Sequence, residues 1–344
     1  MKQFRKMIAA VLTVAMAASL GACANGGAAT SSAAVSSAAA SAEGGKMINI
    51  GVAQLLTHPA LDASLKGFKA ALASQGFEEG KNVTYDIQNA QGDQSNCITI
   101  ANTFANKKPD LILAIATPAA QAVAKVISDT PVMITAVTDP AEAKLVASNE
   151  KPGGNVSGTS DKTPVKEQME LLKEIVPNVQ TVGIMYTSSE TNSQLQAKWA
   201  KAACEEMGLK YQEFTISNTN EIQQVAQSMV GKVQAVYIPT DNMLASGMKN
   251  VAAVTNAAKL PLIVGEVGPV QNGGLCTVGI NYEKLGYQTG LMAAKVLKGE
   301  AKPADMPIEY QADYDISYNS AVAKQLGITL PDRILKGEDV AKTK

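Results

Sequence analysis

The sequence predicts an α/β protein made of two doubly wound parallel-sheet lobes that are joined by a multi-strand hinge. Three observations predict this fold. Short β-rich runs alternate with helical patterns from Met47 onward, the same order of segments recurs in the second half, and a turn-rich stretch ends each copy. Strands that are apolar throughout are typical of parallel sheets with helices on both faces. A chain of 344 residues is long enough for two such lobes.

The first copy alternates strands with helices in a simple order. Its β-rich runs lie at residues 48–53, 82–88, 110–115 and 131–137, and helical spacing of apolar residues lies at 61–74, 93–106 and 118–127. The third run reads DLILAI, which indicates a strand that is buried on both faces. This order is that of a parallel sheet with crossover helices.

The second copy repeats this order. TVGIMY at 181–186 corresponds to NIGVAQ at 49–54, and PLIV at 261–264 corresponds to PVMI at 131–134. A third pair, 234–238 and 110–116, falls between them, with offsets of roughly 123 to 132 residues. A single pairing could arise by chance, but three in the same order indicate a duplicated unit.

Turn-rich stretches at 151–155 and 271–274, and a third near 303–310, are suited to places where the chain crosses between lobes. We therefore expect an N-terminal lobe of residues 47–160 plus about 278–307. The C-terminal lobe is expected to contain residues 161–277 plus about 308–344. Ligands of open α/β sheets bind beyond the carboxyl ends of the strands, so two facing lobes would share one cleft.

The N-terminus is typical of an export signal. Lys2, Arg5 and Lys6 precede an apolar stretch at 7–20, which is short for a membrane span. Small residues then precede Cys23 in a pattern that resembles the lipobox of bacterial lipoproteins. We expect residues 1–22 to be a lipoprotein signal peptide, Cys23 to be lipidated, and the Ala/Ser/Gly-rich residues 23–46 to be a flexible tether. The alternative is an ordinary signal peptide with an incidental cysteine.

These N-terminal features predict that the folded part of the protein is lipid-anchored at the outer face of the cell membrane of a bacterium.

Near-neutral charge, with 30 Lys+Arg against 31 Asp+Glu, argues against nucleic-acid binding. Arg5 and Arg333 are the only arginines, so a bound anion would be held by lysines, hydroxyls or backbone amides.

One histidine and four cysteines argue against a His/Cys metal site and against a histidine-dependent catalytic triad. Cys97, Cys204 and Cys276 are an odd number and widely spaced, so we expect small buried residues without a disulfide framework.

An anion seat is predicted directly after the third strand. Thr117 can act as an N-cap and Pro118 as the first helical residue. The small side chains of Ala119 and Ala120 would leave their backbone amides open to a ligand. The alternative is a plain helix cap beneath solvent.

Carboxylates follow other predicted strand ends, and they could hold an ammonium group. They are Asp161, Asp241 and Glu266, of which we favour Asp161 and Glu266 over Asp139. Each acid alone could instead cap a helix, as Asp241 is placed to do. An anion seat facing carboxylates predicts a zwitterionic ligand.

Aromatic side chains are scarce at the strand ends, and Tyr186 is the one well-placed ring. Sugar sites usually stack aromatic rings on the ligand, so this scarcity favours an amino-acid-like ligand over a large carbohydrate. His58 lies at a helix start, where it would either begin the helix or contact the ligand.

Several runs together resemble ABC-transporter substrate-binding lipoproteins of the tryptophan/tyrosine type, which have the type I periplasmic-binding-protein fold. The runs are QLLTHPALDASLKGF, ATPAAQ, AVTDPAEA, GTSD, PTDN and VGINYEKLGYQTGLMAAKVLKGE. The resemblance implies capture of a small solute, often an aromatic or hydrophobic amino acid, and delivery to a membrane permease. It also implies ligand contacts from Gln54, His58, Leu61, Thr117, Ala119, Ala120, Thr138, Asp161, Tyr186, Asp241 and Glu266.

Two other functions remain open from the sequence. An enzyme is disfavoured because no G-x-S-x-G, P-loop, G-x-G-x-x-G or H-E-x-x-H motif occurs, and these absences also predict no cofactor. A nucleoside- or sugar-binding lipoprotein of the same fold is the second alternative. We expect a monomer whose lobes close about the hinge when the ligand touches both.

Overall fold

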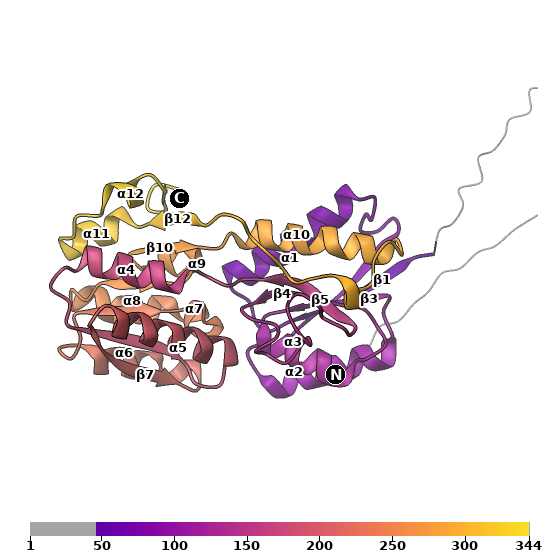
Figure 1. Ribbon diagram of the computed structural model, residues 1–344, viewed down its shortest axis with the longest axis horizontal. Helices are drawn as coiled ribbons and strands as arrows, with labels where there is room; N and C mark the ends of the chain where they lie inside the picture. The colour runs from indigo at the N-terminus through magenta and orange to yellow at the C-terminus, as the bar shows by residue number, and fades with distance from the viewer. Residues whose placement is uncertain (1–45, 344) are drawn as a thin grey trace, which may run out of the picture. The chain divides into compact units, whose positions relative to one another are not determined.

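Two β-sheets organise residues 46–343, the part of the chain that this computed structural model describes (Figure 1). The predicted signal peptide, Cys23 and the tether up to residue 45 lie outside the described residues. The six-stranded sheet has the order β11-β5-β4-β3-β1-β2, and the seven-stranded sheet has the order β13-β12-β10-β9-β8-β6-β7. Each sheet with its packed helices is a lobe, so the predicted fold class of two doubly wound lobes is confirmed.

The first lobe comprises β1 (Ile48–Gln54), α1 (Pro59–Ser74), β2 (Val83–Asn89), α2 (Gln94–Lys107), β3 (Leu111–Ile115), α3 (Thr117–Val126), β4 (Val132–Val137), β5 (Val156–Ser160), α10 (Tyr282–Leu297), η2 (Pro303–Asp305) and β11 (Glu309–Tyr310).

The second lobe comprises α4 (Val165–Ile175), β6 (Thr181–Thr187), α5 (Thr191–Glu206), β7 (Lys210–Ile216), η1 (Thr219–Glu221), α6 (Ile222–Met229), β8 (Ala235–Ile238), α7 (Asn242–Ser246), α8 (Met248–Ala257), β9 (Leu262–Val264), α9 (Val267–Gln271), β10 (Cys276–Gly279), β12 (Asp315–Tyr318), α11 (Ser320–Leu326), α12 (Asp332–Leu335) and β13 (Glu338–Asp339).

The first sheet lies between two pairs of helices. Helices α1 and α10 pack together on one face, and α2 and α3 pack together on the other (Figure 1). Every residue of β3 is fully buried, because helices cover both faces of this central strand. All pairings among β1 to β5 are parallel, so their carboxyl ends meet at one edge of the sheet.

Glycines allow α1 and α10 to pack closely. A Cβ atom at Gly286 would collide with the carbonyl oxygen of Ser64, and one at Gly67 would collide with that of Glu283. The two backbones can approach this closely only because both positions lack a side chain. The late helix α10 is thereby fixed to the early helix α1. None of the helices within residues 46–343 has the length and apolar character needed to cross a membrane.

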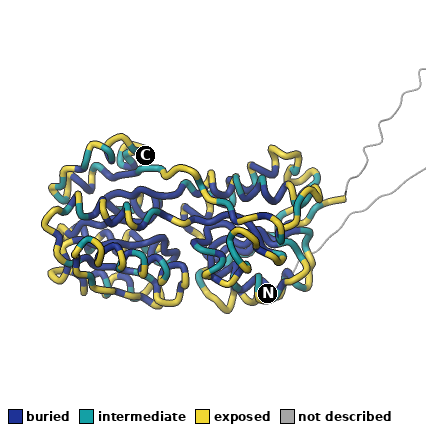
Figure 2. Tube along the Cα trace, viewed as in Figure 1, coloured by how far each residue is buried: buried dark blue, intermediate teal, exposed yellow. Residues whose placement is uncertain are grey.

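The second sheet is covered in the same way. Side chains of β8 alternate between two apolar clusters, as period-two strand geometry requires. Tyr237 packs into the cluster with α4 and α5, whereas Val236 and Ile238 pack into the cluster with α6 and α8. Figure 2 shows most of the backbone inside both lobes buried and the outer loops exposed, and the edge strands β2 and β7 are partly exposed as well. Cys97, Cys204 and Cys276 are buried and free among the described residues.

Within residues 46–343 the chain crosses between the lobes three times, from β5 to α4, from β10 to α10, and from β11 to β12. The last crossing follows Tyr310, because β11 pairs with β5, and it is thus slightly later than the position expected at about 308. The second and third crossing segments are bonded to each other. The Asn281 amide donates to Gln311 Oε1 at 3.1 Å, and Gln311 Nε2 donates back to the Asn281 carbonyl.

Candidate functional site

Buried polar side chains gather where strand ends of the two lobes meet. The first lobe supplies residues that follow β1, β3, β4 and β5, and the second supplies residues that follow β6, β8 and β9. All of them are at most 9% exposed. We call this set the interlobe site; it consists of His58, Thr117, Thr138, Asp161, Glu190, Asn192, Asp241, Asn242 and Glu266.

Hydrogen bonds join the two lobes at this site. Gln196 Nε2 on α5 donates to Thr138 Oγ1 at 3.2 Å and to the Thr240 carbonyl at 3.1 Å. His58 Nε2 lies 3.3 Å from Asn242 Oδ1. The lobes are therefore in polar contact across the site, and its side chains are shielded from water.

The N-terminus of α3 presents free donors to the site. Thr117 is 2% exposed, and its Oγ1 has no partner among the described residues. The amides of Thr117 and Ala119 belong to the first turn, where no carbonyl of the same helix is available. The Ala120 amide, which we expected to be open, instead donates to the Ala116 carbonyl at 3.0 Å. Two amides and one hydroxyl can therefore bind an anion here.

Ala116 makes the sharp turn that leads into α3. Its backbone angles are φ 79° and ψ 150°, a region occupied almost only by glycine. A non-glycine residue in this region stores strain of about 1–3 kcal/mol.

Asp161 and Glu266 form an acid pair next to the hinge. Tyr282 at the start of α10 donates its hydroxyl to Asp161 Oδ2 at 2.8 Å, and Asp161 Oδ1 has no partner within residues 46–343. Glu266 precedes α9 without capping it, and its Oε2 likewise lacks a described partner. Each acid thus keeps one buried oxygen for another group.

Electrostatics make this acid pair a strong site for a cation. Burial raises the pKa of Asp161, although hydrogen bonds from Tyr282 and Thr138 oppose the shift. Burial and the negative charge of Asp161 raise the pKa of Glu266 to about 8. Burial is the main cause of both shifts, the negative charge of Asp161 adds to that of Glu266, and neither acid has a positive charge paired with it. An ammonium group would supply that charge.

Glu190 and Asp241 are a second pair of buried acids, and their own lobe provides many donors to them. Asp241 accepts from the Thr187 amide at 2.6 Å, the Thr187 hydroxyl at 2.7 Å and the Leu244 amide at 2.9 Å. It therefore caps α7, which was the alternative interpretation of its position. Burial raises the pKa of Asp241, and burial with the charge of Asp241 raises the pKa of Glu190 to about 7.

None of the four acids forms a salt bridge with a described lysine or arginine. Within residues 46–343 no group of three or more His, Cys, Asp or Glu side chains is arranged to hold a metal ion. The four acids therefore lack a counter-charge within the described residues, and a cationic ligand group can supply one.

Three predicted contact residues have side chains that pack or form hydrogen bonds elsewhere. Gln54 donates to the Leu56 carbonyl and to Asp62, and Leu61 packs in the core of the first lobe. Tyr186 packs against the second-lobe core and donates its hydroxyl to Glu213 at 2.7 Å. Each of these side chains is engaged within its own lobe.

Asp139 has a structural role in its loop. Its Oδ1 accepts from the amides of Ala141 and Glu142 and from Asn149.

Thr117 and Asp139 also line a pocket of about 280 Å³, which Asn192 and Lys198 of the second lobe complete. This pocket adjoins the anion seat and is the place where a lysine comes near it.

Four residues of the interlobe environment were missed by sequence reasoning: Glu190, Asn192, Asn242 and Tyr282. Asn192 Oδ1 is another buried atom without a described partner. The first two follow the strand predicted at 181–186, so their place at a strand end was a signal that could have found them. Tyr282 has no local signal, because it reaches Asp161 from 121 residues away.

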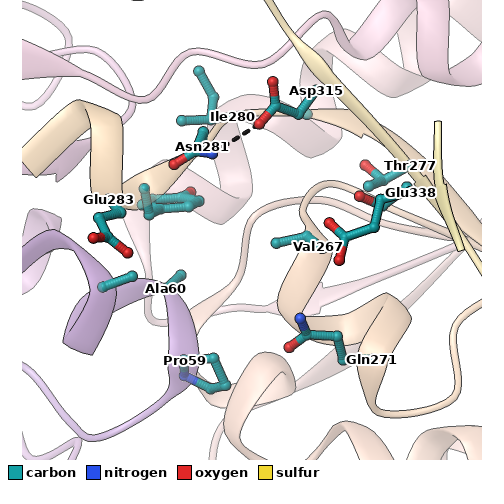
Figure 3. A pocket seen from close by; sticks show the side chains of 14 residues that line it. Pro59, Ala60, Val267, Gln271, Thr277, Ile280, Asn281, Glu283, Asp315 and Glu338 are labelled. Atoms are coloured by element: carbon teal, nitrogen blue, oxygen red, sulfur yellow. Dashed lines mark hydrogen bonds between the residues drawn. The ribbon is translucent and has the colours of Figure 1, made fainter. Parts of the chain in front are cut away.

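A further pocket of about 190 Å³ lies beside the crossing segments (Figure 3). Carboxylates of Glu283, Asp315 and Glu338 surround it, and Asn281 bonds to Asp315 at its edge. Thr277 Oγ1, also unpartnered within the described residues, belongs to its wall.

The two doubly wound lobes, three crossings and buried interlobe site define a binding protein with the type I periplasmic-binding-protein fold. The chain belongs to the ABC transporter substrate binding protein family, whose family model matches residues 49–342. The predicted family resemblance is thus confirmed. Binding proteins of ABC importers act outside the cytoplasm, which makes this chain extracytoplasmic.

Two similar proteins are described by the amino acid that they bind. A tyrosine-binding protein of Clostridioides difficile is 43% identical over 281 residues, which are 82% of this chain and 81% of that protein. An ABC domain from Streptococcus pneumonia, solved in complex with L-Trp, is 41% identical with a TM-score of 0.82, covering 85% of this chain and 99% of that one.

A third relative was solved in another state. The ligand-free, open structure of a Clostridium difficile substrate-binding protein with adhesive properties is 46% identical and covers 85% of this chain and 98% of that one. Its TM-score is only 0.66. The present structure therefore agrees better with the L-Trp complex than with the open protein, although its sequence is more similar to the open one.

Proposed function

We propose that this protein captures a zwitterionic amino acid with an aromatic side chain in the interlobe site and delivers it to an ABC permease. The names of the relatives, one a tyrosine-binding protein and one a complex with L-Trp, support this ligand class. The proposal includes binding and release without chemical turnover, since the relatives reported above are binding proteins.

The observation that carries the proposal is the acid pair. Asp161 and Glu266 come from different lobes, are at most 4% exposed, and each has an unpartnered buried oxygen. Buried carboxylates without a counter-charge are costly, and a ligand ammonium would offset that cost. An α-ammonium group placed between them would also connect the lobes.

The α-carboxylate is assigned to the N-terminus of α3. The free amides of Thr117 and Ala119 and the Thr117 hydroxyl offer neutral donors at the positive end of a helix. Together with the acid pair they match the two ends of an amino acid. The remaining predicted contacts, Gln54, Leu61, Ala120 and Tyr186, stay predictions.

Hinge closure is proposed as the transport-linked step. The His58–Asn242 and Gln196–Thr138 contacts join the lobes, and a ligand that touches both lobes favours the closed state. The better agreement with the L-Trp complex than with the open relative supports this assignment. The permease would then bind the closed form.

Calorimetry with matched ligands tests the proposal. L-tyrosine and L-tryptophan should bind, whereas tyramine, which lacks the carboxylate, and the deaminated analogue of tyrosine should each bind at least tenfold more weakly. Asp161→Asn should weaken L-tyrosine binding by more than tenfold. Asp139→Asn is the matched control, because its Oδ1 acceptor is retained in the loop. Binding of a nucleoside or sugar in place of amino acids would overturn the assignment.

The lipid anchor is tested separately, since Cys23 lies outside the described residues. Cys23→Ala should leave L-tyrosine affinity unchanged and release the protein from membranes. Membrane retention of this variant would contradict anchoring at Cys23 and would favour the alternative of an incidental cysteine.

A further inference from the structure

His58 is the only histidine of the chain, and it connects the lobes at the centre of the site. It is 6% exposed and precedes Pro59 at the start of α1, where its side chain does not cap the helix. Its Nε2 faces Asn242 Oδ1 of the other lobe at 3.3 Å. Its Nδ1 is buried and has no partner among the described residues.

Glu190 determines how Asn242 is oriented. Donors converge on the Glu190 carboxylate: Asn192 Nδ2 at 3.2 Å and Asn242 Nδ2 at 2.5 Å reach Oε2, and the Met243 amide reaches Oε1 at 3.3 Å. At pH 8, above the raised pKa of Glu190 of about 7, the ionised carboxylate only accepts hydrogen bonds, so Asn242 must turn its NH₂ group toward Glu190. Its carbonyl oxygen Oδ1 must then face His58.

The proton position on His58 follows from this orientation. Because Asn242 Oδ1 is an acceptor, His58 Nε2 must carry the hydrogen that forms the contact. Burial lowers the pKa of His58 to about 4, so the ring is neutral and has a single N–H. Nδ1 is therefore a bare acceptor. Buried polar atoms are almost always hydrogen-bonded, which makes a donor from the ligand the missing partner.

We infer that the chain Glu190–Asn242–His58 selects, through the bare Nδ1 of His58, an amino acid whose side chain carries a hydrogen-bond donor. A phenol O–H or an indole N–H satisfies this condition, and the phenyl ring of phenylalanine does not. The inference rests on the proposed function, because it assigns the side-chain end of the same ligand. A donor at Nδ1 would extend a hydrogen-bond chain through both lobes, and so it would also favour the closed state.

The single histidine permits a direct test of the hydrogen-bond chain Glu190–Asn242–His58. In untagged protein labelled with ¹⁵N-histidine, one set of imidazole signals reports the tautomer of His58. We expect the Nε2–H tautomer at pH 8 in ligand-free protein. L-tyrosine should shift the Nδ1 signal toward that of a hydrogen-bonded nitrogen, and L-phenylalanine should not. An Nδ1–H tautomer would contradict the proposed hydrogen-bond chain, whether or not any amino acid binds.

Affinity ratios test the selection. Wild-type protein should bind L-tyrosine at least tenfold more tightly than L-phenylalanine, and L-tryptophan at least tenfold more tightly than 1-methyl-L-tryptophan. His58→Leu should abolish the preference: loss of the contact with Asn242 lowers both affinities, and loss of Nδ1 lowers the affinity for tyrosine further. Gln94→Ala is the control, because it removes another interlobe bond, to the Ser189 carbonyl, and should change both affinities equally.

Failure of the side-chain selection can be distinguished from failure of the proposed function. Equal affinity of the wild-type protein for tyrosine and phenylalanine would overturn the selection and leave the proposed function intact. An unchanged preference in His58→Leu would do the same. If no amino acid binds at all, the proposed function fails and the selection fails with it.

Discussion

The hydroxyl of Tyr282 donates to Asp161 Oδ2 at 2.8 Å, and this bond joins two of the three segments where the chain crosses between lobes. Asp161 follows β5 at the first crossing, and Tyr282 begins α10 at the second. The carboxylate proposed to hold the ligand ammonium is therefore held by a hydroxyl from the hinge. Ligand charge and hinge position are coupled through one hydrogen bond.

Tyr282→Phe should weaken L-tyrosine binding about tenfold, because hydrogen bonds to charged groups contribute about 1.5–3 kcal/mol. Without the hydroxyl, the pKa of Asp161 rises further and the acid takes up a proton, so the ammonium loses part of its counter-charge. Calorimetry at pH 7.5 measures the effect. Tyr287→Phe is the matched control on α10, since its hydroxyl bonds only to the surface residue Ser74. Equal behaviour of the two variants would contradict the coupling.

The acid pair predicts how stability depends on pH. The pKa of Glu266 is about 8 in the folded protein and near 4.5 when unfolded, so the folded state binds more protons between these values. Stability of the ligand-free protein should therefore fall as pH rises from about 5 to about 8. Glu266→Gln should flatten the slope. The raised pKa of Glu190 contributes in the same direction, whereas the lowered pKa of His58, about 4, opposes the trend below about pH 6.5. Thermal melts across this range measure it.

The ligand should weaken this trend. An ammonium group beside the acid pair lowers the pKa of Glu266, so binding should release protons near neutral pH. Calorimetry in two buffers of different ionisation enthalpy measures the number released. A number indistinguishable from zero at pH 7 would contradict contact between the ammonium and Glu266.

Gly286→Ala should destabilise the protein by about 3 kcal/mol or more, because the new methyl group meets the Ser64 carbonyl of α1 and backbone must shift. Denaturant unfolding measures the loss. Gly154→Ala is the control, since a Cβ there meets nothing within 4 Å. A normal midpoint for Gly286→Ala would show that α1 and α10 can separate at little cost.

Ala116→Gly should stabilise the protein by about 1 kcal/mol, a rise in Tm of roughly 2 °C. Glycine adopts the backbone angles of Ala116 without strain, and this gain exceeds the added chain entropy of about 0.5–1 kcal/mol. Ala116→Val should lower Tm. A lower Tm for the glycine variant would contradict stored strain at this turn.

Much of the fold was predictable because its information is local. The apolar run of β3 is fully buried, and the alternation of strands and helices defined both sheets. The polar residues after β3, β5 and β9 were predictable for the same reason, since parallel strands end at one edge. Thr117, Asp161 and Glu266 all retain unpartnered buried atoms in the interlobe site.

The remaining contacts of the site depend on structural detail that local sequence patterns do not contain. Strand β6 continues through Thr187, and successive side chains point to opposite faces, so Thr187 reaches Asp241 while Tyr186 packs on the other face. Whether a strand ends one residue earlier or later decides which side chain enters the site. The contact of Tyr282 with Asp161 depends on tertiary folding alone.

The three crossings also bear on how such a protein can be divided or recombined. A fragment that stops at Ser160 would lack α10 and β11, so it would expose the glycine-bearing face of α1 and leave β5 as an open edge. Neither contiguous half of the sequence therefore corresponds to one complete lobe. Exchanging ligand preference between relatives by swapping contiguous halves should therefore produce misfolded chimeras, whereas grafting individual strand-end loops preserves both sheets.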